Sequence, residues 1–504
     1  MPDLATSELR LYDTMTRSVE PFAPADGRTV RMYTCGPTVY KPAHLGNFRT
    51  FLFEDLLRRT LRLRGWSVDQ VMNLTDVDDK IIAKAHREGL TIGAITDPEI
   101  TVFHADRRYL KIEDAEHYPR ATDYIPQMIQ LVGRLMARKL AYRADDGSVY
   151  FAIGRFPQYG RLSRLDTREV KAGARVAQDD YSKENAQDFA LWKAAKPEDE
   201  RAGAAWDSPW GRGRPGWHLE CSAMAQALLG DTLDLHCGGV DLIFPHHEDE
   251  IAQSEGATGV TFSRRWCHGE FLLTDGAKMA KRVGNVLSVA DLRAARISGA
   301  ALRHLMYTTH YRQVLNLSEA ALEASQRAVA HVGEFAERVA APGARGGTPA
   351  MAAIADEFAD RVRAALFDDL NAPQALAAVF DFVRAANADL DRRGNDQGAL
   401  ERARGAVAFI EATLGIVPPA RAGGVVGGTD GAAAAAVGAV GAVAVAETAE
   451  DLVFRQYVEE RLRARREARS RRDFRAADAI REELASRGVS IADSGDGTSW
   501  KKTG

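Results

Sequence analysis

The sequence of 504 residues is poor in cysteine, and its four cysteines are Cys35, Cys221, Cys237 and Cys267. Four are too few for a disulfide framework at this length, so we expect a reduced protein of the cytoplasm. No apolar run approaches the roughly 20 residues that a membrane helix needs. The first residues also lack the apolar core of a secretory signal. We therefore expect neither a membrane protein nor an exported one.

An excess of charge of one sign is also absent, because 66 Lys and Arg face 70 Asp and Glu, for a net charge of −4. Charged residues make up 27% and hydrophobic residues 45%, which excludes a mainly disordered chain or a fibrous rod. At about 150 residues per domain, this length indicates three or four domains. The overall charge neither requires nor excludes nucleic acid as a partner, so a local basic patch would have to make that case.

The first half of the chain alternates strand-like and helix-like segments. A buried strand is predicted at 30–35, a helix from His44 to Gly65, a second strand from Ser67 and a second helix from Asp78. This alternation predicts an α/β fold with a doubly wound, Rossmann-like parallel sheet. The pattern is irregular up to about residue 205 and then resumes. We therefore predict a sheet domain in two halves, 1–125 and 206–285, split by a connective insertion, 126–205.

The second half is predicted to be mostly helical. A region at 286–317 follows the sheet domain, and long amphipathic segments predict a helical bundle over 318–418. Residues 419–450 are almost all Ala, Gly and Val, which is typical of a low-complexity linker. A small α/β domain is predicted at 451–504. Its helical part carries eight arginines between 461 and 475, which form either a nucleic-acid contact or a solvated helix neutralised by nearby glutamates.

One candidate site begins where the first helix follows the first strand. The motif His44-Leu45-Gly46-Asn47 lies shortly after Cys35-Gly36-Pro37-Thr38-Val39-Tyr40. The N-terminus of a helix offers unpaired N–H groups and a positive dipole end, which suit phosphate. Gly46 leaves room for a flat adenine ring, and His44 and Asn47 are three residues apart on one face. The alternative is a helix start with no ligand.

A second candidate site contains two lysines. Lys278 and Lys281 are three residues apart in a glycine-flanked loop. Such a loop can bring cations to a triphosphate and stabilise the charge of a leaving pyrophosphate. The alternative is a pair of solvated surface lysines.

The third candidate is a metal site. His246 and Glu250 are four residues apart on a helix predicted to begin at Pro245, and Cys35 and Cys221 could add two thiolates. Two sulfurs, one imidazole nitrogen and one carboxylate oxygen suit tetrahedral zinc. No C-x-x-C motif is present. The alternative is buried cysteines beside a helix whose first turn is acidic.

Taken together, the motifs resemble the class I aminoacyl-tRNA synthetases. H-x-G-N near the N-terminus is followed more than 200 residues later by K-M-x-K on a split, doubly wound sheet. The resemblance is strongest to the cysteinyl-tRNA synthetases. It rests on YTCGPTVYKPAHLGNFRTFLFEDLLRR, NLTDVDDKII, PGWHLECSAMA, FPHHEDEIAQSE, DDLNAP and the C-terminal DFRAADAIREELASRG. It extends over nearly the whole chain outside 421–450.

The resemblance implies a role for each matching residue. The residues that match the zinc ligands of that family are Cys35, Cys221, His246 and Glu250. The residues that match its two ATP-binding signatures are Pro37, Thr38, His44, Gly46, Asn47, Lys278 and Lys281, with His44, Asn47 and the two lysines as catalytic residues. The residues that fall where the family lines its amino-acid pocket are Thr75, Trp217 and Asp241. The chain departs from the family at Ala280 and Arg282, which replace serines, and at Cys237, which replaces a glycine.

The function implied by the resemblance is ATP-dependent ligation of L-cysteine to the 3′ end of cysteine tRNA, through a cysteinyl adenylate, with release of AMP and pyrophosphate. One Zn²⁺ per subunit would recognise the substrate thiol, and Mg²⁺ would accompany ATP. Zinc binds a soft thiolate better than a serine hydroxyl, so we expect discrimination without an editing domain. The helical bundle would contact the anticodon stem of the tRNA and the C-terminal domain its anticodon loop, in a monomeric protein. Residues 421–450 would be dispensable for adenylate formation.

Three other readings stay open from the sequence. A ligase that joins cysteine to an amino sugar in mycothiol synthesis resembles this chain in its zinc and ATP sites, but it ends without an anticodon-binding domain. A zinc hydrolase or deaminase would need an H-E-x-x-H or an H-x-E…C-x-x-C motif, and neither is present. An RNA-binding relative without activity would not need His44, Asn47, Lys278 and Lys281.

Overall fold

The computed structural model describes residues 8–164, 188–274, 277–278, 287–392, 394 and 396–419, and part of 461–502. The chain divides into two compact units, Met1–Gly441 and Ala442–Gly504. Most of the predicted linker, from residue 420 on, lies outside the described residues, as do Ala280, Lys281 and Arg282.

A parallel four-stranded sheet forms the centre of the first unit, as the sequence predicts. Its strands are β3 (Thr29–Thr34), β4 (Ser67–Met72), β9 (Leu235–Gly239) and β10 (Trp266–Gly269), in the order β10-β9-β3-β4. Side chains on the two faces of β3 belong to different cores. Met32 packs with α1 (Leu45–Leu63), whereas Tyr33 packs with α7 (Trp217–Leu229) and α8 (Glu248–Thr258). Helices on both faces confirm the doubly wound, Rossmann-like α/β fold.

The chain between β4 and β9 forms a second sheet and several helices. Besides α7, its described helices are α2 (Asp79–Glu88), α3 (Ile92–Tyr109), α4 (Ile125–Ala137) and α6 (Pro197–Ala202), with short 3₁₀ turns at Ala121–Tyr124 and Ile153–Arg155. The antiparallel sheet consists of β5 (Ala141–Arg143), β6 (Val149–Phe151), β7 (Phe189–Ala194) and β8 (Gly213–Pro215), paired in that order. This sheet interrupts the Rossmann-like domain where an insertion is expected. It runs to Pro215, past the predicted end of the insertion at 205.

A small sheet and two short helices connect the sheet domain to the bundle. The strands are β11 (Leu272–Thr274), β12 (Ala277–Lys278) and β13 (Leu315–Leu317), in the order β12-β11-β13, and the helices are α9 (Val289–Ala294) and α10 (Gly299–Tyr307). Near the N-terminus, β1 (Arg10–Asp13) and β2 (Ser18–Pro21) form a hairpin. Lys278 is therefore carried on the edge strand of the connecting sheet.

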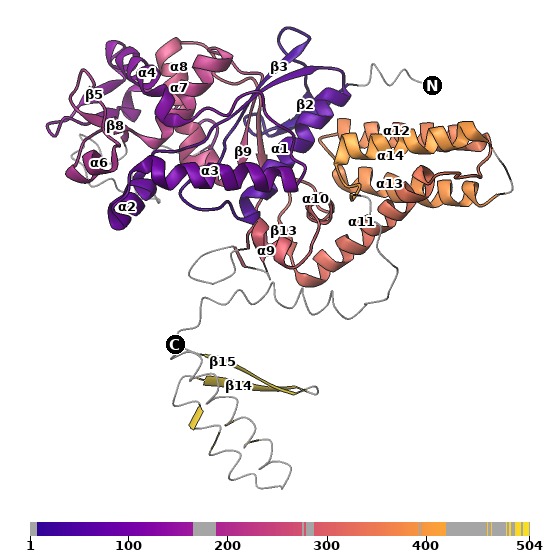
Figure 1. Ribbon diagram of the computed structural model, residues 1–504. Coiled ribbons are helices and arrows are strands. Elements are labelled where there is room, and N and C mark those ends of the chain that lie inside the picture. The colour runs from indigo at the N-terminus through magenta and orange to yellow at the C-terminus, as the bar shows by residue number, and fades with distance from the viewer. Residues whose placement is uncertain are drawn as a thin grey trace. The chain divides into compact units, whose positions relative to one another are not determined.

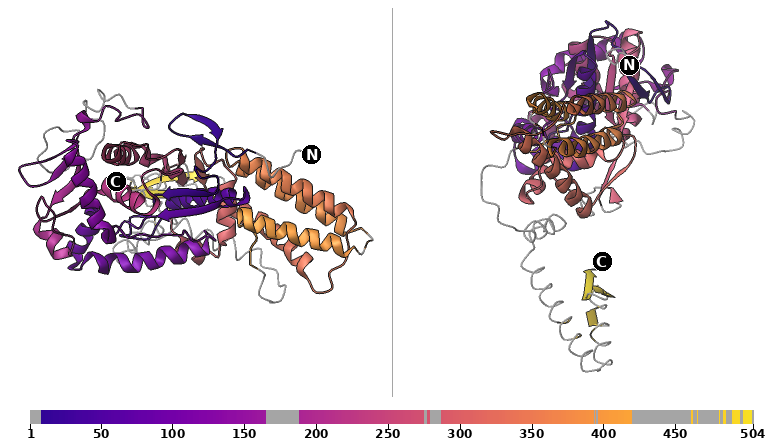
Figure 2. Two further views of the ribbon diagram at one scale, coloured as in Figure 1. Left: turned by 90° about the horizontal axis from the view of Figure 1, so that it is seen from above. Right: turned by 90° about the vertical axis from the view of Figure 1, so that its right-hand side faces the viewer.

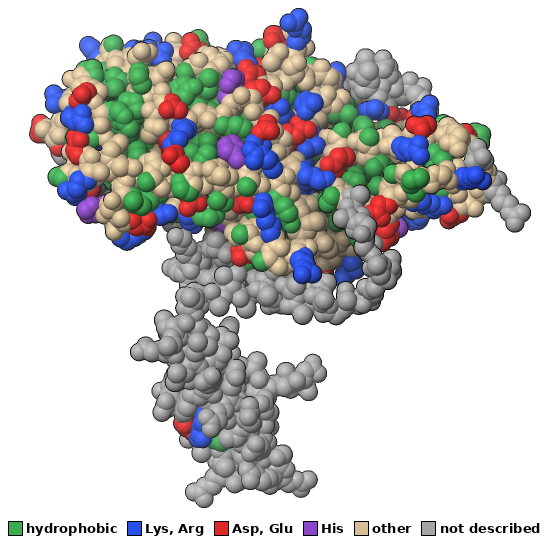
Figure 3. All heavy atoms as spheres, in the orientation of Figure 1, with side chains coloured by type: hydrophobic (Ala, Val, Ile, Leu, Met, Phe, Trp, Pro, Cys, Tyr) green, Lys and Arg blue, Asp and Glu red, His purple; other side chains and the backbone are tan. Residues whose placement is uncertain are grey.

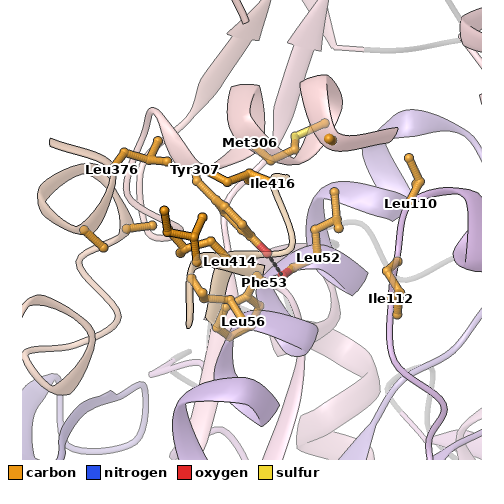
Figure 4. Packing of buried hydrophobic residues seen from close by; sticks show 14 of the residues in the cluster. Leu52, Phe53, Leu56, Leu110, Ile112, Met306, Tyr307, Leu376, Leu414 and Ile416 are labelled. Atoms are coloured by element: carbon orange, nitrogen blue, oxygen red, sulfur yellow. Dashed lines mark hydrogen bonds between the residues drawn. The ribbon is translucent and has the colours of Figure 1, made fainter. Parts of the chain in front are cut away.

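The helical bundle follows as predicted. Its helices are α11 (Glu319–Ala340), α12 (Ala350–Phe367), α13 (Ala372–Leu390) and α14 (Gln397–Leu414), and α12 packs against both α13 and α14 (Figures 1 and 2, orange). The bundle shares a hydrophobic core with α1. In this core the Tyr307 hydroxyl donates a hydrogen bond to the Leu52 carbonyl at 3.3 Å, between Leu56 of α1 and Leu414 of α14 (Figure 4). The bundle is thus packed directly onto the helix that carries the H-x-G-N motif.

In the second unit the structure describes a hairpin and a few helical positions. Strands β14 (Val489–Ser494) and β15 (Gly497–Lys502) pair antiparallel. Of the eight clustered arginines, two are described: Arg461 forms an ion pair with Glu483, and Arg465 is buried. Arg461 is therefore neutralised by Glu483 of the same unit, and Arg465 is not part of an exposed basic patch.

No helix among the described residues is long and apolar enough to cross a membrane. On the face drawn in Figure 3, positive and negative side chains are interspersed over the described part of the first unit. This distribution agrees with the small net charge.

Candidate functional site

The start of α1 is built by the H-x-G-N motif itself. His44 is the N-cap, and its Nδ1 accepts a hydrogen bond from the Asn47 backbone N–H at 3.2 Å. Asn47 returns the contact, since its Oδ1 accepts from the His44 backbone N–H at 3.2 Å. With Nδ1 as an acceptor, a neutral His44 ring carries its proton on Nε2. The cap therefore fixes the side chains of His44 and Asn47 on the first turn of α1, at the helix N-terminus.

A cavity of about 350 Å³ lies at this helix start. The residues predicted for the site that line it are Cys35, Pro37, Thr38, His44, Gly46, Asn47, Trp217 and Asp241. Its rim adds Lys41 and Lys80, whose ammonium groups lie 5.4 Å and 5.9 Å from the centre of the Tyr40 ring. The cavity thus combines an anion-favouring helix end with a lining of mixed charge, because Asp241 and Glu270 line it together with the two lysines.

Of the residues predicted for ATP and amino-acid binding, Thr75, Lys278 and Lys281 are not among the described residues that line the cavity. Thr75 is buried behind the cavity wall, where its backbone pairs with Pro37 and Val39 and its hydroxyl accepts from Asn73 at 3.0 Å. Lys278 lies on β12, where the structure describes the backbone, and Lys281 lies outside the described residues. The geometry of the lysine pair around a ligand therefore remains a prediction.

Four of the predicted residues converge as a candidate metal site beside the cavity. The ligand atoms of Cys35, Cys221, His246 and Glu250 all lie within 4.8 Å of one another, and all four side chains are buried. They come from the end of β3, from α7, from the turn before α8 and from α8. His246 Nε2 lies 3.1 Å from Glu250 Oε1. Buried thiolate and carboxylate groups need a positively charged partner. A set of two sulfurs, one nitrogen and one oxygen suits a divalent cation such as zinc.

The ionisation of these groups fits a cation site. A hydrogen bond from Cys35 lowers the pKa of Cys221 to about 6, even though burial raises it. Burial raises the pKa of Cys35 well above its ordinary value. Burial also raises the pKa of Glu250, but His236 and His246 outweigh it and lower that pKa to about 2. Cys221 and Glu250 therefore provide two anionic ligands at neutral pH.

His246 is oriented by a second histidine. Its Nδ1 lies 3.0 Å from His218 Nδ1, while its Nε2 faces Glu250. A metal-binding imidazole commonly uses its other nitrogen in this way, which fixes the ring orientation. His218 also lies 3.4 Å from Asp249, so the orienting contact continues into α8.

A second set of four ligands overlaps the first. Cys35, His236, His247 and Glu250 also have ligand atoms within 4.8 Å of one another. His236 Nε2 lies 2.9 Å from Glu250 Oε2, and His247 Nε2 lies 3.4 Å from the Cys35 sulfur. The sequence analysis missed both histidines. His247 directly follows His246, and His236 occupies an apolar strand, where a polar residue is the one sequence signal of a buried role.

The helical stretch that carries His246 and Glu250 begins where the sequence predicts. Phe244 has extended backbone angles and is the one residue of the π-helical turn Ile243–His247 with a non-helical conformation. Pro245 and His246 are therefore helical and lead directly into α8, so His246 lies one turn before Glu250. Cys237, which replaces a glycine of the family, is fully buried in the core beside α1 and packs there as a small apolar residue.

Comparison with known proteins was informative over the whole chain. Residues 21–327 match the family described as tRNA synthetases class I (C) catalytic domain. Residues 361–417 match the DALR domain, and residues 455–500 match the cysteinyl-tRNA ligase anticodon binding domain. A cysteine–tRNA ligase of Chlamydia caviae is 41% identical over 498 residues, which cover 98% of each chain. The chain belongs to the cysteine–tRNA ligase family. A further member, from Solibacter usitatus, is 40% identical over 98% of this chain and 99% of its own.

Solved structures support the fold of this cysteine–tRNA ligase family member. The methionyl-tRNA synthetase of Mycobacterium tuberculosis in complex with methionyl-adenylate aligns with a TM-score of 0.57 at 18% identity. The alignment covers 77% of this chain and 92% of that one. At this identity the likeness concerns the class I fold alone.

Proposed function

We propose that this chain joins L-cysteine to the 3′ end of cysteine tRNA with ATP, through a cysteinyl adenylate, releasing AMP and pyrophosphate. The observation that carries the proposal is the buried cluster of Cys35, Cys221, His246 and Glu250, next to the cavity at the start of α1. Cys35 belongs to both, so a ligand atom of the cluster opens onto the nucleotide-sized cavity. A site for a thiol thereby adjoins a site for phosphates.

Within this proposal the cluster holds one Zn²⁺ per chain through Cys35, Cys221, His246 and Glu250. When bound, zinc would supply a Lewis acid that takes up the substrate thiol as a thiolate. The protein side chains hold the anionic ligands ready in a buried setting, and His218 keeps the His246 ring in place. A serine hydroxyl ionises less readily and is a harder ligand, so the same site would reject serine.

The residues of the two ATP-binding signatures would each contribute to the activation of the amino acid. The N–H groups of α1, with His44 and Asn47, would bind the nucleotide, and Pro37, Thr38 and Gly46 would shape the wall around it. Lys278 and Lys281 would neutralise the charge that develops on the departing pyrophosphate, together with Mg²⁺. The cysteine carboxylate attacks the α-phosphate of ATP, and the P–O bond to pyrophosphate breaks.

Trp217 and Asp241 would bind the amino acid on the opposite wall. Trp217 is 38% exposed although it is a large apolar ring, and its ring centre lies 4.3 Å from that of His246. The Asp241 carboxylate, which lines the same cavity, can accept hydrogen bonds from an ammonium group. Thr75 is buried behind Pro37, and through its backbone pairing with Pro37 and Val39 it would support the wall that faces the nucleotide.

We assign tRNA binding to the other parts of the chain. Residues 318–418 would contact the anticodon stem and residues 451–504 the anticodon loop, which agrees with the matches to a DALR domain and an anticodon binding domain. A ligase for an amino sugar has no use for such domains. We further propose a monomer in the cytoplasm, which is supported by four cysteines that are all free thiols.

Two assays test the proposal. Cysteine-dependent exchange of pyrophosphate into ATP should occur, and unfractionated tRNA should then accept labelled cysteine. Exchange without charging of tRNA would instead point to the amino-sugar ligase. Failure of both reactions with the zinc-loaded protein would contradict the proposal.

A further inference from the structure

Asp369 ties the turn between α12 and α13 to two distant segments. Its side chain accepts hydrogen bonds from the Tyr12 backbone N–H at 2.9 Å, from the Tyr311 hydroxyl at 2.7 Å and from Arg312 Nε at 2.8 Å. Its carbonyl accepts from His310 Nε2 at 2.8 Å. The residue is 4% exposed and has a φ of +54°, in the left-handed region that non-glycine residues adopt at a cost, and the contacts of its side chain offset that cost.

The segment that Asp369 holds is also held from the other side by α1. The guanidinium of Arg49, two residues after Asn47, is buried and donates to the carbonyls of Thr309 at 3.2 Å and His310 at 3.0 Å. The Tyr311 ring stacks on Phe53 of α1, with ring centres 4.4 Å apart and planes within 3°. Residues 309–312 are therefore fixed between the bundle and the helix of the first signature.

This segment leads directly to the strand that carries Lys278. The Tyr311 carbonyl accepts from the Glu270 N–H at 2.8 Å, and Glu270 lines the cavity. Residues 315–317 then form β13, which pairs in parallel with β11, and β11 pairs with β12 so that Leu273 lies opposite Lys278. The segment of Tyr311 is thus joined by backbone hydrogen bonds to the start of β11 and through β13 to the sheet whose edge strand contains Lys278.

We propose that Asp369 is a positioning residue for Lys278. By holding Tyr311 and Arg312 against α1, its carboxylate sets the β13-β11-β12 sheet relative to the start of α1, where the nucleotide binds. The inference rests on the proposed function, because it concerns the activation step. It adds a residue of the helical bundle to the determinants of that step.

The variant Asp369→Asn keeps the shape of the side chain but removes the charge that pairs with Arg312. We expect kcat of cysteine-dependent pyrophosphate exchange to fall about tenfold, while KM for ATP and for cysteine stays within about threefold, because Lys278 acts in the transition state. The matched control is Asp389→Asn. Asp389 is a buried aspartate of the same bundle, and its carboxylate accepts from the Thr348 N–H and hydroxyl. The control should lower the unfolding temperature but leave kcat within about twofold.

A double-mutant cycle tests whether Asp369 acts through Lys278. In a Lys278→Ala background, Asp369→Asn should lower kcat by less than about twofold further, since the group it positions is gone. Full multiplication of the two effects would overturn the proposal, as would equal kcat values for Asp369→Asn and Asp389→Asn. If Asp369→Asn does not fold, the same double-mutant cycle is measured with Tyr311→Phe, which removes the hydrogen bond from the Tyr311 hydroxyl to Asp369. The same non-additive effect on kcat is then expected. A wild-type protein without cysteine-dependent exchange would instead refute the proposed function.

Discussion

Arg303 of α10 and Asp55 of α1 form an ion pair at 2.6 Å in which neither side chain has any exposed surface. Arg303 also donates to the Leu414 carbonyl at 2.8 Å at the end of α14, and Arg59 adds a second hydrogen bond to Asp55 at 2.7 Å. The pair thus joins the sheet domain, the connecting helices and the bundle at one buried point. A buried charge that loses its partner is costly, so this junction makes the packing of the three parts interdependent.

Replacing Arg303 with Met should destabilise the protein by about 3–5 kcal/mol, because it leaves the Asp55 carboxylate short of a buried counter-charge and the Leu414 carbonyl without its donor. Urea unfolding of the first unit, followed by tryptophan fluorescence, measures the change. The control is Arg361→Met, whose ion pair with Asp381 has both side chains more than 40% exposed and should cost less than about 1 kcal/mol. Equal losses for the two variants would contradict the prediction.

Asp55 should also make the stability depend on pH. Burial raises its pKa, but Arg303 and Arg59 outweigh burial and hold that pKa below its ordinary value of 3.8. A carboxylate with a lowered pKa contributes stability that is fully present above the unfolded pKa. That contribution is lost as the pH falls through the folded pKa, by up to about 1.4 kcal/mol per pH unit.

The unfolding free energy of the wild type should therefore fall more steeply than that of Asp55→Asn between pH 5 and pH 3. Asp55→Asn starts less stable but lacks this titration. Parallel curves for the two proteins over that range would show that Asp55 does not contribute to the acid sensitivity.

The reciprocal cap of α1 predicts a specific effect of Asn47→Ala. The substitution removes the acceptor of the His44 N–H, which should cost about 1 kcal/mol of stability, and it also removes a donor from the cavity. The cysteine-dependent exchange rate should fall at least about tenfold. Ser318→Ala removes the N-cap of α11 and provides the control, since it should cost similar stability and leave the exchange rate unchanged.

The repeating patterns of the sequence predicted most of the fold. The strand at 30–35, the helix up to Gly65 and a helical bundle over 318–418 follow from hydrophobic periodicity, whereas the number and bounds of the bundle helices were not predicted. The insertion was predicted as a break in that pattern. The C-terminal end of the insertion was predicted too early, at residue 205. The last strand of its sheet, β8, is only three residues long and pairs with β7 through backbone hydrogen bonds, which leave no periodic signal in the sequence.

The candidate site was harder to predict. Cys35, Cys221, His246 and Glu250 could be grouped through the family resemblance. His218 and His247 lie in segments that contribute to the resemblance, but like His236 they received no role from the sequence, because their contacts form only in the folded chain. The role of Asp369 could likewise not be predicted from the sequence. It lies in DDLNAP, which contributed to the resemblance, but its contacts with Tyr12 and Tyr311 depend on how the bundle packs on α1. Long-range contacts of this kind leave no local trace in a single sequence.

The two overlapping ligand sets differ in their histidines, because the first contains His246 and the second contains His236 and His247. Replacing His246 or His236 should therefore change the bound zinc differently, depending on which set holds the ion. If zinc is held by Cys35, Cys221, His246 and Glu250, His246→Ala should lower the bound zinc from about one ion per chain to a small fraction of that. His236→Ala should lower zinc affinity by about 10- to 100-fold, because His236 lies 2.9 Å from the Glu250 carboxylate and would act by orienting it.

The metal content of the purified variants, and competition with a chelator of known affinity, show which of the two ligand sets holds the zinc ion.

A further variant, Cys221→Ser, extends the test to substrate specificity, because Cys221 belongs to the first ligand set alone. It should lose zinc and also lose discrimination between cysteine and serine in the exchange reaction, because a hydroxyl is a harder and less readily ionised ligand than a thiolate. Unchanged zinc in Cys221→Ser together with zinc loss in His236→Ala would assign the ion to the second set, with Cys35 and Glu250 as the ligands common to both.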